Sequence, residues 1–275
     1  MKNSAKNVIV AILKIVLVSA IALLLASISA SVIYSIFENS DINFLIIYVF
    51  DSLIKFAISL LAIWLFLRFF DKKKLSELGF KLNGHWFNVL AGIIVSSLII
   101  LVGTAIILIT KNAEIHFFNI QAEYLICSFI ITAFAAAIEE VVFRGYVLNV
   151  LRNICEKKIA ILISALFFLA FHLLSPDFSL LAFINVFLAG ILLGLLYIRK
   201  MNLWLPIAFH IFWNFIQSIL GYSVSGGEEM PAIFTIEYAQ ENVINGGDFG
   251  FEGSLICSIL LFVTILFAHK KHKSL

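Results

Sequence analysis

The sequence has few charged residues for its length, and this shortage excludes whole classes of protein. Only 13% of the 275 residues are charged, whereas 62% are hydrophobic, and this composition is far more apolar than that of an average soluble domain. The net charge of +2 is too small to indicate nucleic-acid binding, and Lys and Arg residues lie at the ends of apolar runs rather than along one basic face. We therefore expect the chain in a lipid bilayer, with no nucleic-acid partner.

Cysteine and proline are also scarce. Cys127, Cys155 and Cys257 lie far apart and show no CxxC or CxxH spacing, so the sequence predicts neither a disulfide framework nor a thiolate metal site. Only three prolines occur, and apolar runs of roughly 18 or more residues recur, each long enough to cross a hydrocarbon core about 30 Å thick. Membrane-spanning helices are the expected structure.

Charged interruptions divide the chain into apolar blocks, each of which predicts one helix. The blocks are residues 10–36, 46–69, 87–110, 123–150, 158–174, 179–198, 203–222 and 254–268. The first follows Lys2 and Lys6 and is longer than the apolar core of a usual signal peptide, so we interpret it as a membrane anchor, with a cleaved signal peptide as the alternative. The predicted fold is an all-α, polytopic transmembrane bundle of about eight helices.

Lys and Arg residues occupy alternate connections between these blocks. They precede the first block, follow the eighth, and lie between the second and third, the fourth and fifth, and the sixth and seventh. The other connections are acidic, with Lys111 as their only cation. Because cytoplasmic connections carry the positive charge, both termini are expected in the cytoplasm. Residues 223–253 then form a Gly-punctuated acidic loop on the outer face, either a cap over a site or a solvated connector.

Three ionisable residues interrupt the fourth block. Each charge at the middle of a membrane costs about 3 kcal/mol, so Glu139, Glu140 and Arg144 are expected to face protein or water rather than lipid. Glu140 and Arg144 are four residues apart and can pair on one helix face, an arrangement that we interpret as structural. Glu139 is rotated by about 100° from Glu140 and is left free to act as a general base.

Polar residues also interrupt the fifth and seventh blocks. His172 ends the sequence FLAFH, and His210 and Asn214 bound the sequence HIFWN. Histidine can accept or donate a proton near neutral pH, and Asn can donate a hydrogen bond to an oxyanion. Counting about 1.5 Å per residue, Glu139, His172 and His210 lie roughly 15–21 Å from the cytoplasmic ends of their blocks. Helix tilt can absorb the differences, so a hydrolytic site in one layer is expected.

Two other polar features have a structural interpretation. Asp51 and Lys55 form an i, i+4 pair in the second block, which we place near a membrane interface. Asn185 lies in the sixth block, where we expect it to hydrogen-bond a neighbouring helix rather than to enter the site.

The motifs EExxxR, FxxxH and HxxxN, in this order within apolar blocks, resemble those of the CPBP family, the type II CAAX prenyl endopeptidases and their bacterial relatives. The sequences NLWLPI at 202–207 and NGGDFGFEGS at 245–254 extend the resemblance. It covers about residues 122–222 and implies an intramembrane endopeptidase. The roles implied are water activation by Glu139 and His172, an oxyanion held by His210 and Asn214, and a site shaped by Glu140 and Arg144.

The resemblance also implies a division of the chain into three parts. Residues 1–121 would form N-terminal transmembrane helices, residues 122–222 the catalytic helical core, and residues 223–275 the acidic loop and last helix. The expected partners are the lipid bilayer and a peptide or membrane-protein substrate. The residue usage is rich in Ile, Phe, Lys and Asn, which indicates an A·T-rich bacterial genome, so we expect a bacterial plasma membrane and a substrate that need not be prenylated.

Zinc is the one candidate cofactor. Family members are commonly labelled metalloproteases, and Glu139, His172 and His210 are a set of residues that can hold zinc. The HExxH motif of zinc proteases is missing from the sequence, and a Glu and His pair can activate water without metal. We therefore expect no tightly bound metal.

Two other functions compete with proteolysis. Glu, His and Arg side chains inside a membrane also build proton relays, which indicates a proton-coupled transporter, although the sequence shows neither an inverted repeat nor the paired broken helices of many transporters. The second is a bacteriocin-immunity or scaffold protein that keeps the fold without catalysis.

Overall fold

The computed structural model describes residues 5–37, 43–81, 84, 86–119, 121–227 and 232–273. Its long helices are α1 (Ala5–Phe37), α2 (Phe44–Phe66), α3 (Trp86–Ile109), α4 (Ala122–Glu140), α6 (Lys157–His172), α7 (Leu180–Lys200), α8 (Trp204–Leu220) and α9 (Leu255–Lys273). Two of them continue into further helical turns: α2 into the π-helical segment η1 (Leu67–Asp71), and α4 into the π-helical segment η3 (Val141–Leu148) and α5 (Asn149–Leu151). The prediction of an all-α membrane bundle is confirmed.

Only some of these helices are long and apolar enough to cross a membrane. By length and composition, four spans in the described part of the chain qualify: Phe44–Asp71, Trp86–Ile109, Ala122–Leu151 and Leu180–Lys200. Shorter apolar helical stretches lie in α1, α8 and α9. The chain is an integral membrane protein, and the crossing of the membrane by about eight helices stays a prediction.

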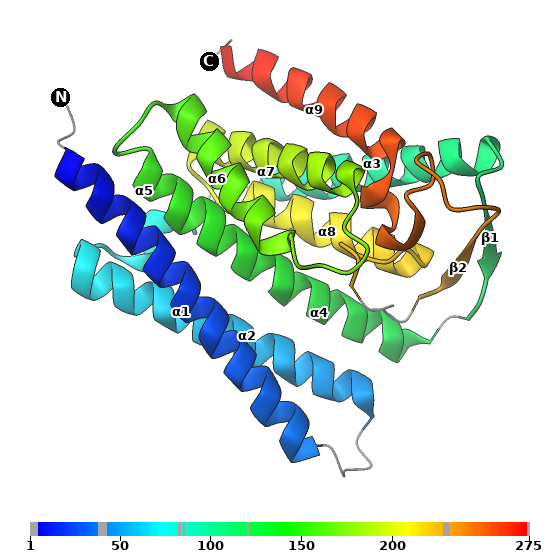
Figure 1. Ribbon diagram of the computed structural model, residues 1–275, viewed down its shortest axis with the longest axis horizontal. Helices are drawn as coiled ribbons and strands as arrows, with labels where there is room; N and C mark the ends of the chain where they lie inside the picture. Colours follow the sequence, from blue (N-terminus) through cyan, green and yellow to red (C-terminus); the bar gives the residue numbers. More distant parts are fainter. Residues whose placement is uncertain are drawn as a thin grey trace.

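The helices pack as a bundle in which neighbours in sequence are often neighbours in space (Figure 1). α1 and α2 form an antiparallel pair that lies along α4, while α3 packs along α8, and α7 contacts α6 and α9. Both chain ends lie at the same end of the bundle in Figure 1. This arrangement agrees with an even number of crossings, and the assignment of that end to the cytoplasm stays a prediction.

Small residues let some of these helices approach closely. A Cβ atom added to Gly190 on α7 would lie 2.9 Å from the Cβ of Ala165 on α6, and one added to Gly92 on α3 would lie 2.8 Å from the backbone oxygen of Leu205 on α8. Lipid tails are as apolar as Leu, so close van der Waals packing drives the association of helices in membranes. Gly190 thus lets α7 approach α6, and Gly92 lets α3 approach α8.

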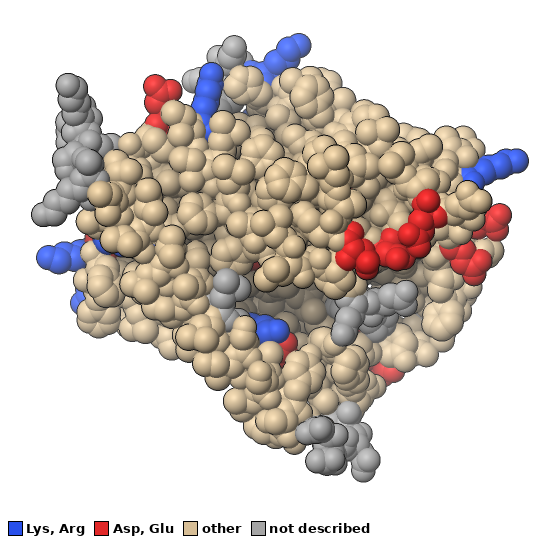
Figure 2. All heavy atoms as spheres, viewed as in Figure 1, with Lys and Arg blue, Asp and Glu red and all other residues tan. Residues whose placement is uncertain are grey.

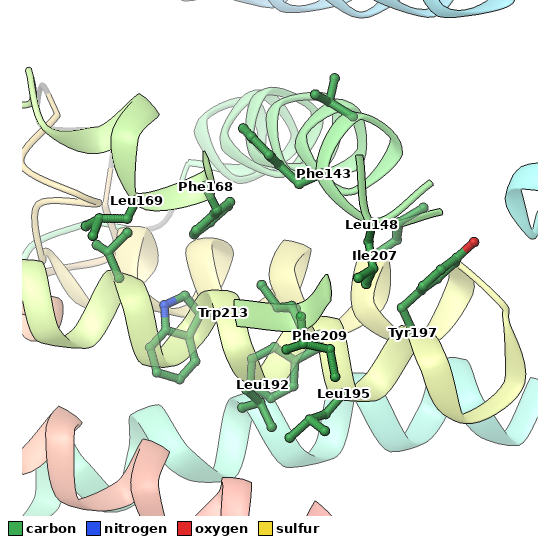
Figure 3. Close-up of a cluster of buried hydrophobic side chains, with 14 of the residues drawn as sticks. Phe143, Leu148, Phe168, Leu169, Leu192, Leu195, Tyr197, Ile207, Phe209 and Trp213 are labelled. Atoms are coloured by element: carbon green, nitrogen blue, oxygen red, sulfur yellow. The ribbon is translucent and has the colours of Figure 1, made fainter. Parts of the chain in front are cut away.

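The centre of the bundle is filled by aromatic and aliphatic side chains. Figure 3 shows Phe143, Phe168, Phe209 and Trp213 in one cluster between the helices. The rings of Phe143 and Phe168 meet edge to face, with centroids 5.3 Å apart. All eight residues of η3 are buried, so the polar residues on either side of this segment are held in a tightly packed wall.

A two-stranded antiparallel sheet lies at the end of the bundle opposite the termini (Figure 1). Strand β1 (Ala113–Phe117) pairs with β2 (Phe234–Tyr238), so that Ala113 faces Tyr238. The sequence analysis assigned both segments to loops. Five-residue strands that pair across more than a hundred residues leave no local signal strong enough to identify them.

The segment after β2 is packed into the protein. It contains two single 3₁₀ turns, η4 (Gly247–Phe249) and η5 (Phe251–Gly253), in which both phenylalanines are buried. Another 3₁₀ turn, η2 (Leu75–Leu78), lies elsewhere in the chain, after η1. Asn185 on α7 donates to the backbone oxygens of Glu252 and Ser254, at 2.7 and 2.8 Å. The interpretation of Asn185 as a structural hydrogen-bonding residue is confirmed. The solvated-connector interpretation is wrong for this part of the loop, whereas Glu228 and Glu229 lie outside the described residues.

Candidate active site

The six residues that the sequence singled out come from four elements of the bundle. Glu139 and Glu140 close α4, and Arg144 lies one turn further on in η3. His172 is the last residue of α6, and His210 and Asn214 lie one turn apart on α8. A π-helical segment directly beside the paired glutamates is notable because such segments occur frequently at functional sites.

Glu140 is the centre of a buried charge network. Its Oε1 accepts a hydrogen bond from Nη1 of Arg144 at 2.7 Å and from Nδ1 of His210 at 2.9 Å. The side chains of Glu140 and Arg144 are fully buried. The i, i+4 spacing predicted the first contact, but the second joins residues 70 positions apart and only the packing of α8 against α4 produces it.

Arg144 is held on two further sides. Its Nη2 donates to the backbone oxygen of Gly190 at 3.2 Å, and its guanidinium lies 4.4 Å from the centre of the Phe168 ring. Arg can satisfy a carboxylate, a carbonyl and an aromatic face at once because its charge is planar and delocalised. The side chain therefore ties α4, α6 and α7 together behind the site.

Glu139 faces both histidines. Its Oε2 lies 4.0 Å from Nε2 of His172 and 4.0 Å from Nε2 of His210. These separations are too long for direct hydrogen bonds. The side chain of Glu139 is 32% exposed, against 14% for His172 and 8% for His210, so it is the most exposed of the three, although its Oε2 atom is buried.

Hydrogen bonds on the far side of each ring orient the two histidines. Nδ1 of His172 lies 2.8 Å from the backbone oxygen of Phe168, and Nδ1 of His210 lies against the carboxylate of Glu140. A carbonyl or an ionised carboxylate can only accept, so Nδ1 carries the proton in both rings. In this tautomer, Nε2 is an acceptor while the ring is neutral and a donor once the ring is protonated.

Asn214 lies one turn beyond His210, and its side-chain oxygen is buried without a hydrogen-bond partner. The same is true of Glu139 Oε2, Glu140 Oε2 and Nε of Arg144. A buried polar atom without a partner costs about 1–3 kcal/mol. A polar ligand that reached these atoms would be stabilised by them.

Residues 121–216 match the family model of the Rce1-like type II CAAX prenyl endopeptidases. The matched range contains all three motifs. This match supports membership of the CPBP family. Membership supports CAAX-type protease activity in a membrane in general terms and does not identify the catalytic residues. No curated protein matches the chain significantly.

The zinc site proposed for the CPBP core can be tested against the geometry. Within the described residues, no three His, Cys, Asp or Glu side chains are grouped closely enough to hold a metal ion. Glu139, His172 and His210 offer suitable atoms, since zinc binds carboxylate oxygen and imidazole nitrogen at about 2.0–2.2 Å, but they do not fit this requirement as they stand. We therefore derive no reaction step through a metal.

Glu252 is a buried carboxylate that sequence reasoning missed. It accepts hydrogen bonds from Nε1 of Trp213 on α8 and from the hydroxyl of Ser225, the latter at 2.6 Å. Together with His172 and His210 it lines a cavity of about 20 Å³, room for about one water molecule. The only signal in the sequence was the FEGS segment in the family resemblance, which indicated no role for this carboxylate.

Removal of this carboxylate is expected to destabilise the protein. Glu252→Ala would leave the indole N–H of Trp213 buried without an acceptor, which lowers the free energy of unfolding by about 1–3 kcal/mol. Thermal unfolding in detergent measures the effect. Asp248→Ala, an exposed residue of the same segment, is the matched control, and equal unfolding temperatures for the two variants would contradict the prediction.

A larger groove gives access to Glu139 from the side of the bundle. It has a volume of about 380 Å³ and lies between α1, α2 and α4, and its lining includes Tyr34, Tyr48, Ser59, Phe134, Ile138 and Glu139. Figure 2 shows a hollow on the face that carries these helices, with a basic and an acidic side chain at its edge. The groove connects the side chain of Glu139 to the exterior of the bundle.

Proposed function

We propose that the chain is an intramembrane endopeptidase that hydrolyses a peptide bond of a membrane-associated peptide or protein. The observation that carries the proposal is the position of Glu139, whose Oε2 lies 4.0 Å from Nε2 of both His172 and His210 and whose side chain lines the groove. A carboxylate and a neutral imidazole that share one water molecule are the groups required for general-base catalysis.

In the proposed reaction Glu139 and His172 activate the water. Its oxygen attacks the carbonyl carbon of the scissile bond, and its proton passes to Glu139 or to Nε2 of His172. The tetrahedral intermediate then collapses, the C–N bond breaks, and the same proton goes to the leaving amine. General-base assistance of this kind contributes about 10²–10⁴-fold to a rate.

In this proposal His210 and Asn214 stabilise the oxyanion. Since Nδ1 of His210 donates to Glu140, Nε2 can donate to an oxyanion only when the ring is protonated. The amide nitrogen of Asn214 supplies a donor that does not titrate. Removal of one donor from an oxyanion site costs about 10²–10³-fold in rate.

Purified protein is expected to cleave members of a fluorogenic peptide library in detergent, and a zinc chelator is expected to leave the rate unchanged. The physical reason is that the proposed water-activating atoms belong to side chains alone. The measurement is the initial rate with and without chelator, followed by addition of zinc. Loss of activity with chelator and recovery with zinc would contradict metal-independent hydrolysis.

The same assay separates proteolysis from its two competitors. A chain that folds in detergent but cleaves no peptide would overturn the proposal in favour of an immunity or scaffold protein. Proton flux into liposomes, lost on substitution of Glu139, would instead favour a proton-coupled transporter, which uses the same residue types.

A further inference from the structure

An ion pair lines the groove that leads to Glu139. Asp51 and Lys55 lie one turn apart on α2, with Nζ 2.6 Å from Oδ2, and both contribute to the wall of the groove. The sequence analysis placed this pair near a membrane interface. The structure shows that Asp51 is only 4% exposed, so its carboxylate belongs to the inside of the groove.

The second oxygen of Asp51 has no partner. Oδ1 is buried and accepts no hydrogen bond within the described structure, while the side chain of Lys55 is 38% exposed and has N–H groups to spare beyond the one directed at Asp51. A buried acceptor without a donor is destabilising. The pair therefore has one unpaired acceptor, on Asp51, and spare donors, on Lys55, in the wall of the groove.

The distance from this pair to Glu139 follows from the packing of α2 against α4. The two helices run in the same direction in Figure 1, and the rings of Phe56 and Phe134 meet with centroids 5.1 Å apart, which sets their relative positions. At about 1.5 Å per residue, Lys55 and Asp51 lie about 9 and 15 Å along the groove from the level of Glu139. An extended chain covers these distances in about three to five residues.

A peptide bond that is open to attack must lie outside a helix, so the backbone N–H and C=O groups beside it lack intramolecular partners. Inside a membrane each unpaired group costs several kcal/mol unless the protein supplies a partner. The rest of the groove is lined mainly by apolar side chains, among them Ile131, Phe134, Ile138 and Phe171. Such a lining suits apolar substrate side chains, and the ion pair supplies hydrogen-bonding groups for the backbone beside the hydroxyl groups of the serine and tyrosine residues in the lining.

We propose that Asp51 and Lys55 bind the backbone of an extended, apolar substrate segment about three to five residues from the scissile bond. Oδ1 of Asp51 accepts a backbone N–H, and Nζ of Lys55 donates to a backbone carbonyl. Recognition of the backbone makes the groove tolerant of side-chain sequence, provided that the segment is apolar. The inference rests on the proposed protease function for the identity of the scissile bond.

Binding to an inactive variant tests the pair without cleavage. The full chain carrying Glu139→Gln is titrated in detergent with a short dye-labelled peptide of Leu, Val, Phe and Ala residues. Addition of Asp51→Leu and Lys55→Met together removes both hydrogen-bonding groups and leaves no unpaired charge. We expect Kd to rise about tenfold or more.

A second ion pair provides the matched control. Lys14 and Asp71 also form a pair, but neither residue lines the groove, so Lys14→Met with Asp71→Leu should leave Kd unchanged. Methylation of each peptide N–H in turn identifies the group that meets Asp51. With Asp51 and Lys55 present, one methylation should weaken binding, and in the double variant the same methylation should have no further effect.

The outcomes separate this inference from the proposed function. Unchanged Kd in the double variant, an equal loss in the control, or no peptide binding to the Glu139→Gln chain would overturn the backbone-binding role. If binding depends on the pair as expected but wild-type protein cleaves nothing, the protease proposal fails and the peptide site stands.

Discussion

Glu139→Gln is expected to lower the rate of peptide cleavage by about 10²–10⁴-fold, the contribution of a general base, while the protein stays folded. Glutamine has nearly the same shape as glutamate but cannot take the proton of the attacking water. The carboxylate makes no direct hydrogen bond to either histidine at 4.0 Å, so its loss leaves no buried charge without a partner. The rate of cleavage per folded molecule is the measurement.

The matched control for this variant is Glu123→Gln, which makes the same chemical change in the exposed first turn of the same helix. It should keep full activity. His172→Ala should lower the rate of cleavage as Glu139→Gln does, because the two side chains share the proposed water. Cleavage that survives either of these site substitutions would remove the corresponding catalytic role.

Arg144→Met is expected to have the largest effect on stability. The substitution leaves the carboxylate of Glu140, which is fully buried, without its main counter-ion, and breaking a buried ion pair in this way costs about 3–5 kcal/mol. It also removes the hydrogen bond to Gly190 and the contact with the Phe168 ring. Thermal unfolding in detergent should show a large decrease in the unfolding temperature.

A double variant separates folding from catalysis at this network. Glu140→Leu together with Arg144→Met replaces the buried pair by apolar side chains, an exchange that is often neutral for stability. We expect it to be more stable than Arg144→Met alone but still inactive, because Nδ1 of His210 loses the acceptor that orients the ring. Full activity in a stable double variant would show that Glu140 does not position His210.

The helices were predictable because their signal is local. The block predicted at residues 203–222 is observed as Trp204–Leu220, and the block at 87–110 as Trp86–Ile109. A long apolar run in a membrane has one way to satisfy its backbone, which is to form a helix. The strands β1 and β2 escaped prediction because each is five residues long and depends on a distant partner.

Part of the candidate site was predictable for the same reason. The contact between Glu140 and Arg144 follows from their i, i+4 spacing on one helix, and it is observed at 2.7 Å. The contact of Glu140 with His210 and the burial of Glu252 beside Trp213 depend on the packing of separate segments. No spacing within one helix encodes them.

The sequence by itself determined the class of protein, the helical blocks and the residue types available for chemistry, because these depend on composition and on periodicity within one segment. Only the tertiary structure decided that Glu139 faces two histidines, that Glu140 holds one of them, and that Asp51 and Lys55 line the same groove as Glu139. The physical reason is that a charge inside a bilayer must find partners, and which partners it finds depends on how helices from distant parts of the chain pack together.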